Sequence, residues 1–408
     1  MTRRIQPVFI VGTGRCGSTM LSNMIREHAD ILSVSEFLVS VTDLGGRIAQ
    51  AFPEGGWMDA RQVWDVLAGF HPRQTVMLRQ GVEMDEMLYP LAPNSRFSRQ
   101  TGVPAILFTT LPHLTADHDA LFEELHEYVM TFQTDLAIRQ YERVFEWLMQ
   151  RFGKKVWVER SGGSLRAVPR LSKSLPHARF VHIVRDGRDC SISMSRHEGF
   201  RMMMATTIIS QILGYDPYDS DIRSGVEELP EQFYRLLPEN FTAEAFTQLD
   251  ACADLFGYYW SGEVMRGLKA LAALPPERVL TIHFEDILAD PEPWLRRFIQ
   301  FIGEDFLDER WLQKATATIH PVRSSWRNLP AHEQSSLTDA CRPGFEALAE
   351  QGLARNADQD LGAAPLFGWF HRRVKPLTTL TRTIGLRSAL AVVKGQLGRA
   401  RRTTGSPA

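Results

Sequence analysis

Short apolar runs that end in polar, glycine-containing turns recur along the chain. Four of them are rich in β-branched and aromatic side chains, which is typical of buried parallel strands: residues 7–11, 155–159, 179–184 and 278–284. Apolar positions at helical spacing predict helices over residues 19–28, 141–152, 255–274 and 294–302. Strands and helices alternate in this order, so the pattern predicts an α/β fold in which a central parallel sheet carries helices on both faces.

The remaining segments show weaker patterns. Residues from about 45 to 117 contain Pro and Gly throughout, and we expect an irregular segment there. No strand is predicted between the first helix and this segment. We therefore expect one main domain over residues 1–360, with insertions at about 40–135 and 200–250 that shape a binding site. A separate tail follows over residues 361–408.

Composition narrows the class of protein. Hydrophobic residues make up 44% and charged residues 23% of the 408 positions, as in globular chains. The net charge of −2 excludes a whole-surface nucleic-acid binder, although residues 371–408 hold nine Lys and Arg and no acid. The four cysteines form no CxxC pair, so we expect a reducing, cytoplasmic compartment and neither a zinc site nor disulfides. No acidic cluster suits magnesium, and we expect no metal.

The first predicted strand leads into Gly12-Thr-Gly-Arg-Cys-Gly-Ser-Thr19, which opens a helix. Such a loop directs several backbone N–H groups and the positive end of the helix dipole at one point, which favours a bound phosphate. Gly12 and Gly17 have the spacing of the Walker pattern, but Ser18 stands where that pattern has lysine. Arg15 lies inside the loop and can fork onto an anion. An ordinary tight turn is the alternative interpretation.

A second polar turn follows the strand at 179–184. Arg185 leaves the carboxyl end of that strand, where open α/β sheets bind ligands, and the next helix carries Ser193. The pair could bind a second phosphate. A surface salt-bridge network among Arg185, Asp186, Arg188 and Asp189 is the alternative.

Together these segments resemble sulfotransferases that use 3′-phosphoadenosine 5′-phosphosulfate (PAPS). The first loop is similar to that family's 5′-phosphosulfate loop, and Val184-Arg-Asp-Gly-Arg-Asp189 with Ser193 is similar to its 3′-phosphate motif. Arg278 to Pro291 and Ser324-Ser-Trp-Arg327 resemble two later segments. The resemblance implies a P-loop-like sulfotransferase fold with residues 1–360 as catalytic domain, and PAPS as co-substrate. It implies donor-binding roles for Gly14, Arg15, Cys16, Gly17, Ser18, Thr19, Arg185, Ser193 and Arg327.

The chain departs from the family pattern at three positions. Cys16 replaces a common serine, Phe284 replaces a tyrosine, and Ser325 stands where some relatives have lysine, which leaves Arg323 or Arg327 to supply that charge.

Sulfuryl transfer to a hydroxyl needs a group that accepts the proton. In several relatives this group is a glutamate 21 positions after the loop arginine, and here that position is Glu36. The resemblance thus implies Glu36 as general base and Arg15 as the second catalytic residue. A solvated loop or capping glutamate is the alternative. His28 is the rival base, but it lies at a helix end whose dipole would stabilise its charged form. His113 and His197 lack a supporting context.

The acceptor is less constrained. Met202, Met203 and Met204 suit either core packing or an adaptable apolar cleft. In the tail, Leu386, Leu390, Val393 and Leu397 form a helical stripe beside basic residues, which could lie on an anionic membrane surface or pack on the acidic body. We expect a hydrophobic or lipid-like small-molecule hydroxyl as acceptor and no nucleic-acid partner. A P-loop ATP-dependent kinase and a non-catalytic, membrane-associated nucleotide-binding protein remain as alternatives.

Overall fold

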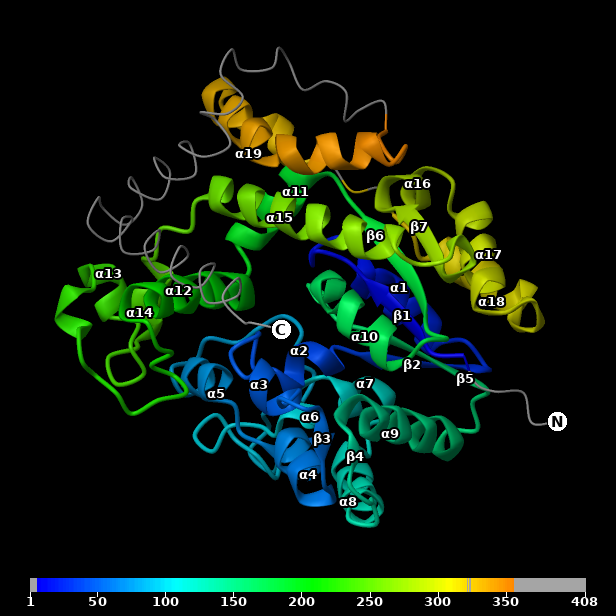
Figure 1. Cartoon of the computed structure of the whole chain (residues 1–408), viewed down its shortest axis with the longest axis horizontal. Coiled ribbons are helices and arrows are strands. Elements are labelled where there is room, and N and C mark those ends of the chain that lie inside the picture. The colour runs from blue at the N-terminus through cyan, green and yellow to red at the C-terminus, as the bar shows by residue number, and fades with distance from the viewer. Residues whose placement is uncertain (1–5, 321, 323, 356–408) are drawn as a thin grey trace, which may run out of the picture.

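A computed structural model describes residues 6–320, 322 and 324–355 (Figure 1). Its centre is a five-stranded sheet in which every neighbouring pair of strands is parallel, with the order β2-β5-β1-β6-β7. The strands are β1 (Val8–Val11), β2 (Ile31–Ser35), β5 (Val156–Arg160), β6 (Arg179–Val184) and β7 (Val279–His283). A small antiparallel pair consists of β3 (Trp57–Met58) and β4 (Asp135–Leu136).

Helices flank the sheet, and the predicted α/β class with a central parallel sheet is confirmed. In chain order they are α1 (Ser18–Arg26), α2 (Phe37–Val41), α3 (Ile48–Ala51), α4 (Ala60–Ala68), α5 (Pro72–Arg79), α6 (Ala105–Phe108), α7 (Thr110–Leu114), α8 (His118–Val129), α9 (Ala137–Arg151), α10 (Val168–Ser174), α11 (Gly187–Ser195), α12 (Glu198–Leu213), α13 (Glu231–Tyr234), α14 (Ala243–Thr247), α15 (Ala253–Ala272), α16 (Phe284–Ala289), α17 (Pro291–Ile302), α18 (Glu309–Ala317) and α19 (Ala331–Glu350). Two short 3₁₀ helices matter below, η1 (Ser164–Ala167) and η5 (Trp326–Asn328).

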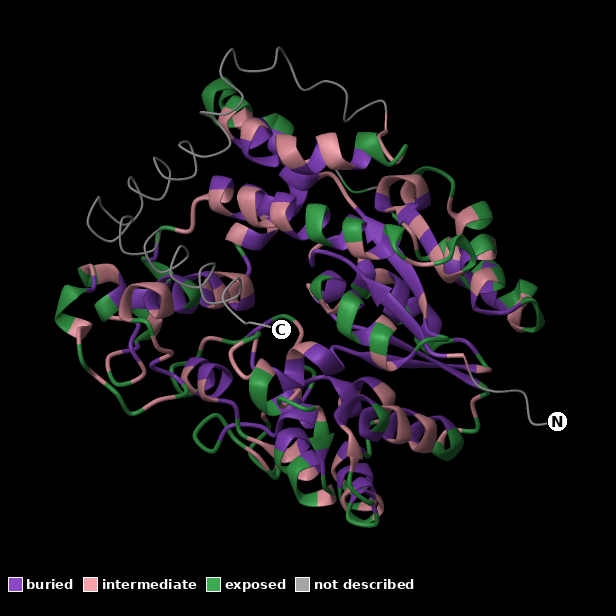
Figure 2. Ribbon diagram, viewed as in Figure 1, coloured by how far each residue is buried: buried purple, intermediate pink, exposed green. Residues whose placement is uncertain are grey.

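The interior strands are mostly apolar because helices cover both sides of them, and Glu159, Arg160 and His182 are polar residues buried within them. All residues of β1 and β5 are buried, as Figure 2 shows for the sheet. In β7, at the sheet edge, buried and half-buried positions alternate. The four predicted strands are therefore correct to within one or two residues.

Two sequence predictions about the first part of the chain are wrong. The segment from 45 to 117 is not irregular, because it holds the helices α3 to α7. One of them, α4, begins with a capping box in which Asp59 and Gln62 satisfy each other's backbone N–H groups. The strand β2 was also not expected; it is buried, and the Ser33 hydroxyl inside it is hydrogen-bonded to Ser22.

Close helix packing supports the sheet on the side of α11, α15 and α19. The indole of Trp260 in α15 lies against Gly187 and Gly344, where an added Cβ would come within 2.5 and 2.4 Å of the ring. Glycine is needed at both positions for this approach, which fixes α11 and hence the turn that follows β6.

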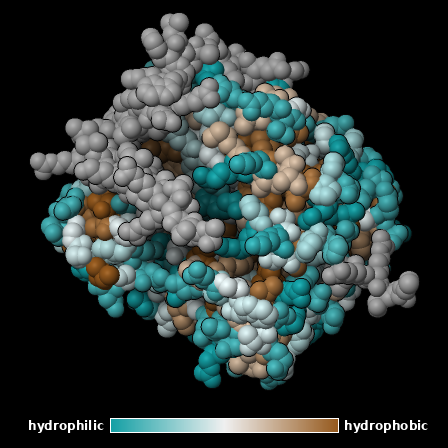
Figure 3. All heavy atoms as spheres, viewed as in Figure 1, coloured by the Kyte–Doolittle hydropathy of each residue, from teal (hydrophilic) through white to brown (hydrophobic). Residues whose placement is uncertain are grey.

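The outer surface is mixed. On the face shown in Figure 3, hydrophilic residues predominate and hydrophobic ones are scattered in small groups. Within the part of the chain that the structure describes, no helix combines the length and apolar character needed to cross a membrane.

Candidate active site

The predicted site residues lie at one edge of the sheet. Since all five strands are parallel, their carboxyl ends meet there. Glu36 follows β2, the loop of residues 12–17 follows β1, and Arg185 follows β6. The strand β5 ends between Glu36 and the loop, and it brings Arg160 to the same edge.

The loop after β1 has the backbone of an anion site. Gly14, Arg15 and Gly17 all have positive φ, and Gly17 precedes α1 without any side-chain cap. A Cβ at Gly17 would come within 2.1 Å of the Phe284 ring, so glycine is required there. Within the described residues, no carbonyl accepts the backbone N–H groups of Arg15 and Gly17. The start of α1 therefore offers unpaired donors and a positive dipole end.

The side chain of Arg15 joins the two predicted motifs. Its Nε donates to the Ser193 hydroxyl at 3.0 Å, and its Nη1 donates to the Glu86 carboxylate at 3.0 Å. Arg185 in turn donates from Nη1 to the carbonyl oxygen of Arg15 at 3.0 Å. Three cation or hydroxyl groups thus gather beside the loop. Of the other loop residues, Cys16 and Ser18 are buried, whereas Thr19 is exposed.

Among the described residues, Arg185 has no salt-bridge partner, so it does not belong to the alternative network. Its guanidinium carbon lies 5.0 Å from the centre of the Phe284 ring, at the position where the family pattern has tyrosine. Arg188, by contrast, is fully buried and forms a bidentate pair with Asp186, with contacts of 2.6 and 3.0 Å. The alternative network is therefore replaced by one buried structural pair that leaves Arg185 at the site.

The segment around η5 is tied to the same edge. The Asp189 carboxylate accepts the backbone N–H groups of Ser325 at 2.6 Å and of Trp326 at 3.2 Å. Arg327 is exposed, with its guanidinium carbon 4.6 Å from the Trp326 ring centre. Arg323 lies outside the described residues.

Glu36 is a buried carboxylate with firm partners. It has φ of 54°, its backbone N–H donates to the Arg160 carbonyl at 2.6 Å, and only 5% of its surface is exposed. The carboxylate accepts from the Arg160 guanidinium and from the Gly162 N–H at 2.8 Å. The interpretation of a solvated loop glutamate is therefore wrong. Burial raises the pKa of Glu36 in spite of the opposing charge of Arg160.

His28 does not behave as its helix position predicts. The ring is buried, with Nε2 2.8 Å from the Phe306 carbonyl oxygen and Nδ1 accepting the Asp30 N–H at 3.1 Å. Burial lowers the pKa of His28 and thus opposes the stabilisation of its charged form that its place at the helix end predicts. Both ring nitrogens are used in these structural contacts.

A second carboxylate, Glu86, faces the site from the segment between α5 and α6. Besides Arg15, it binds His197, whose Nε2 lies 2.8 and 2.7 Å from the two carboxylate oxygens. His197 Nδ1 accepts the Phe200 N–H at the start of α12, which makes Nε2 the donor to Glu86. These contacts lower the pKa of Glu86.

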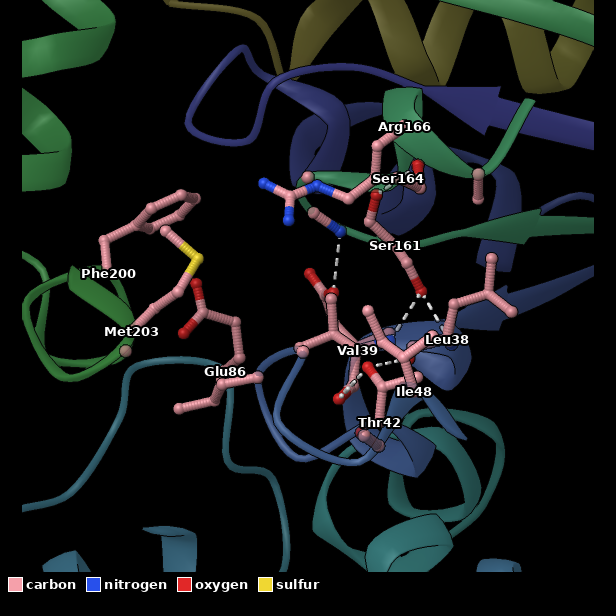
Figure 4. A pocket seen from close by; sticks show the side chains of 18 of the residues that line it. Leu38, Val39, Thr42, Ile48, Glu86, Ser161, Ser164, Arg166, Phe200 and Met203 are labelled. Carbon is pink, nitrogen blue, oxygen red and sulfur yellow. Dashed lines mark hydrogen bonds between the residues drawn. The ribbon is translucent and has the colours of Figure 1, made fainter. Parts of the chain in front are cut away.

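A cavity of about 450 Å³ extends from Glu36 and Glu86; we call it the central cavity. Figure 4 shows Leu38, Val39, Thr42 and Ile48 on one side and Glu86, Phe200 and Met203 on the other. Most of the lining is apolar, and Met203 also lines an adjoining side cavity of about 660 Å³. Met202 and Met204 are buried, so the methionine segment serves both core packing and the cavity wall.

One buried carboxylate supports the site without facing it. Glu159 is fully buried, accepts from the Ser161 hydroxyl at 2.5 Å and the Leu38 N–H at 3.4 Å, and leaves Oε2 without a partner among the described residues. Burial raises its pKa from about 4.5 to about 8. Glu159 thus keeps a proton in the folded protein at neutral pH.

This proton makes the stability depend on pH. Between pH 4.5 and 8 the unfolded chain releases the Glu159 proton while the folded chain holds it, so the free energy of unfolding falls as pH rises. One such group contributes a slope of at most about 1.4 kcal/mol per pH unit. When the free energy of unfolding is measured with urea from pH 5 to 8.5, it should fall less steeply with pH in Glu159→Gln than in the parent chain. Parallel curves would mean that Glu159 is ionised in the folded state.

Several of these residues were not found from the sequence. Arg160 follows a predicted strand just as Arg185 does, so the strand-end argument could have found it. His197 has no supporting context in the sequence, and its partner Glu86 lies 111 positions away. No local pattern marks Glu86. In the described residues, no group of three or more His, Cys, Asp or Glu side chains is arranged to hold a metal ion.

Comparisons with known proteins identify the family to which the chain is similar. The sequence pattern of the sulfotransferase family matches residues 7–258 and 235–309. No curated protein sequence matches the chain.

Solved structures with a similar fold include several sulfotransferases. A sulfotransferase from Alicyclobacillus acidocaldarius shares 17% identity over 87% of this chain and 98% of its own, with a TM-score of 0.38. The sulfotransferase domain of the Synechococcus PCC 7002 olefin synthase shares 16% identity over 83% and 94%, with a TM-score of 0.40. Sulfotransferase STF9 from Mycobacterium avium shares 14% identity over 87% and 78%, with a TM-score of 0.41.

Proposed function

The chain belongs to the sulfotransferase family, and we propose that it transfers a sulfuryl group from PAPS to a hydroxyl group of a small, largely apolar acceptor. One observation carries this proposal. A buried carboxylate, Glu36, and a glycine-containing loop with Arg15 and backbone N–H groups that no carbonyl of the described residues accepts meet at one sheet edge, and Glu36 lines a largely apolar cavity. The cavity has room for an organic acceptor, and the carboxylate is suited to take its proton.

The residues at the sheet edge fit the two charged ends of PAPS. The loop of residues 14–19 would hold the 5′ end through the backbone N–H groups of Arg15 and Gly17, which no carbonyl of the described residues accepts. Arg185 and Ser193 would hold the 3′-phosphate, and Arg327 would cover the nucleotide from η5. When bound, PAPS supplies the sulfuryl group.

In this proposal Glu36 accepts the proton of the acceptor hydroxyl. Its raised pKa makes it a stronger base than an ordinary carboxylate, and Arg160 and the Gly162 N–H hold it in one orientation. Arg15 stabilises the negative charge that develops on the leaving phosphate, in the manner of preorganised donors in other group-transfer sites. Glu86 and His197 fix the guanidinium of Arg15 from the cavity side.

Calorimetry with nucleotides tests the choice of donor. We expect 3′-phosphoadenosine 5′-phosphate (PAP) to bind without magnesium and ATP to bind at least about tenfold more weakly, because Ser18 replaces the Walker lysine and ATP lacks a 3′-phosphate. The variant Arg185→Ala should lose most of the difference in affinity between PAP and ATP. Magnesium-dependent ATP binding that exceeds PAP binding would favour the kinase alternative.

Two further parts of the proposal rest on the sequence. We propose that the chain acts in the cytoplasm, and that residues 361–408 bring it to the inner membrane face and to a lipid-like acceptor. This tail and its stripe of Leu386, Leu390, Val393 and Leu397 lie outside the described residues, so the membrane contact stays a prediction.

A further inference from the structure

Two arginines lie on the wall of the central cavity, outside the group around Glu36. Arg166 belongs to η1 and Arg170 to α10, which continues from it, so the two lie one helical turn apart. Both line the central cavity, and Arg166 also lines the side cavity. We call them the rim arginines, because both residues are exposed.

Arg166 is held by neighbours that leave part of its guanidinium available. Its Nε donates to Glu263 at 2.9 Å and its Nη2 donates to the Tyr259 hydroxyl at 3.0 Å, while 42% of the side chain is exposed. Figure 4 shows its guanidinium end directed into the cavity. Glu263 is buried and also pairs with Arg266. One carboxylate therefore serves two arginines, and the group carries a net positive charge.

Arg170 adds a second uncompensated charge. Its guanidinium carbon lies 5.0 Å from the centre of the Phe52 ring, which itself lines the cavity. In the part of the chain that the structure describes, Arg170 has no ion pair with a carboxylate, whereas its neighbour Arg166 has one with Glu263. A guanidinium that is stacked on a ring but has no carboxylate partner remains free to bind an anion in its own plane.

The acidic groups of the central cavity do not cancel this charge. Glu36 is paired with Arg160, and Glu86 is paired with Arg15 and His197. The lining thus combines the Glu36 carboxylate, apolar residues that include Val39, Ile48 and Phe200, and the rim arginines.

We propose that the acceptor is an amphiphilic anion, with a hydroxyl group placed at Glu36, an apolar body in the central cavity, and a carboxylate or phosphate bound by Arg166 and Arg170. This inference rests on the proposed function, because Glu36 defines the reacting end. It narrows the acceptor from a hydrophobic hydroxyl compound to one that also carries a negative charge.

Binding measurements test the anionic end without turnover. The full chain, saturated with PAP, is titrated with ω-hydroxy carboxylates of increasing chain length and with their methyl esters. We expect the carboxylates to bind about tenfold more tightly than the esters, which is the effect of a charge-assisted contact of about 1.4 kcal/mol. We also expect one preferred chain length, because the two ends are fixed. ω-Hydroxy alkyl phosphates form the second arm and show which anion is preferred.

A matched pair of charge reversals shows where the preference arises. Arg170→Glu should bring the ratio of carboxylate to ester affinity to one or below. Arg310→Glu reverses an exposed charge on α18, which lines neither cavity, and should keep the ratio of the parent chain. Raising the salt concentration should also reduce the ratio in the parent chain.

The outcomes separate this inference from the proposed function. Equal affinity of carboxylates and esters in the parent chain, or an unchanged ratio in Arg170→Glu, overturns the anionic end even if sulfation of other acceptors is observed. Preferential binding of carboxylates that depends on Arg170 supports it. If such bound compounds are never sulfated in the presence of PAPS, the proposed function fails while the anion site stands.

Discussion

Replacing Glu36 with glutamine is expected to lower turnover by about 10²–10⁴-fold, the usual range for loss of a general base. Glutamine keeps the size of the side chain but cannot accept the acceptor's proton. In the parent chain the Arg160 guanidinium and the Gly162 N–H each donate to the carboxylate of Glu36. In the variant, one of these donors must face the amide NH₂ group of glutamine, so some loss of thermal stability is expected as well. PAP binding by calorimetry shows whether the variant is folded, since the loop after β1 is unchanged.

The pH profile distinguishes the base from a merely structural carboxylate. Glu36 acts as a base only when it is ionised, and burial raises its pKa. In a plot of turnover against pH, the acidic limb, where turnover falls with falling pH, should therefore have its midpoint above the usual pKa range of glutamate. This limb should disappear in the residual activity of Glu36→Gln. Glu86→Gln is the matched control: it removes a carboxylate from the same cavity, yet the acidic limb should remain.

His28 offers a second check on this assignment. Its ring is buried against Trp311, with the ring centres 5.2 Å apart, and it does not line the central cavity. His28→Ala should therefore reduce stability and spare turnover per folded molecule. Loss of turnover in His28→Ala with full turnover in Glu36→Gln would show that the base has been misassigned.

The parts of the fold that the sequence predicts are those with a strong local signal. β1 is a continuous apolar run and β6 is apolar except for Arg179 and His182. Both strands end in polar turns, and every residue in them except Arg179 is buried. β2 has the sequence Ile-Leu-Ser-Val-Ser, and its two serines weaken the apolar pattern that would predict a buried strand. The Ser33 hydroxyl is hydrogen-bonded to Ser22, and its oxygen lies 3.2 Å from His113 Nε2. Local composition cannot show that these hydroxyls are satisfied in a core.

The candidate active site also has residues that a local sequence signal predicts and residues that depend on long-range packing. Arg15, Arg185 and Glu36 were predicted because they follow strands or match a spacing, and parallel strands bring their ends to one edge. The burial of Glu36 depends on β5, which supplies Arg160 from 124 positions away. Glu86 and the rim arginines depend on the packing of the segment after α5 and of α10, and no periodicity marks them. Long-range packing, which a single sequence does not display, decides these parts.

Arg15 belongs to the loop after β1 and Arg185 donates to its carbonyl oxygen, yet their alanine variants should fail in different ways. Arg15→Ala should lower turnover by about 10²–10³-fold with a smaller loss of PAP affinity, because the charge that Arg15 stabilises grows only in the transition state. Arg185→Ala should weaken PAP by about 10–100-fold, the loss of a charge-assisted contact, since the 3′-phosphate keeps its charge throughout the reaction. Turnover at saturating PAPS should change less.

The contacts in the structure sharpen this comparison. Arg185 donates to the carbonyl of Arg15, so its removal also loosens the loop, whereas Arg15 holds Ser193 and Glu86 only through its side chain. Arg15→Lys keeps the positive charge but loses the guanidinium group, which contacts Ser193 and Glu86 at the same time. Its turnover should lie between that of Arg15→Ala and that of the parent chain. Single-turnover rates and PAP calorimetry on the three variants measure both effects. If Arg15→Ala and Arg185→Ala weaken PAP equally and leave the single-turnover rate unchanged, Arg15 binds the donor without acting in catalysis, because a residue specific to the transition state must change the rate.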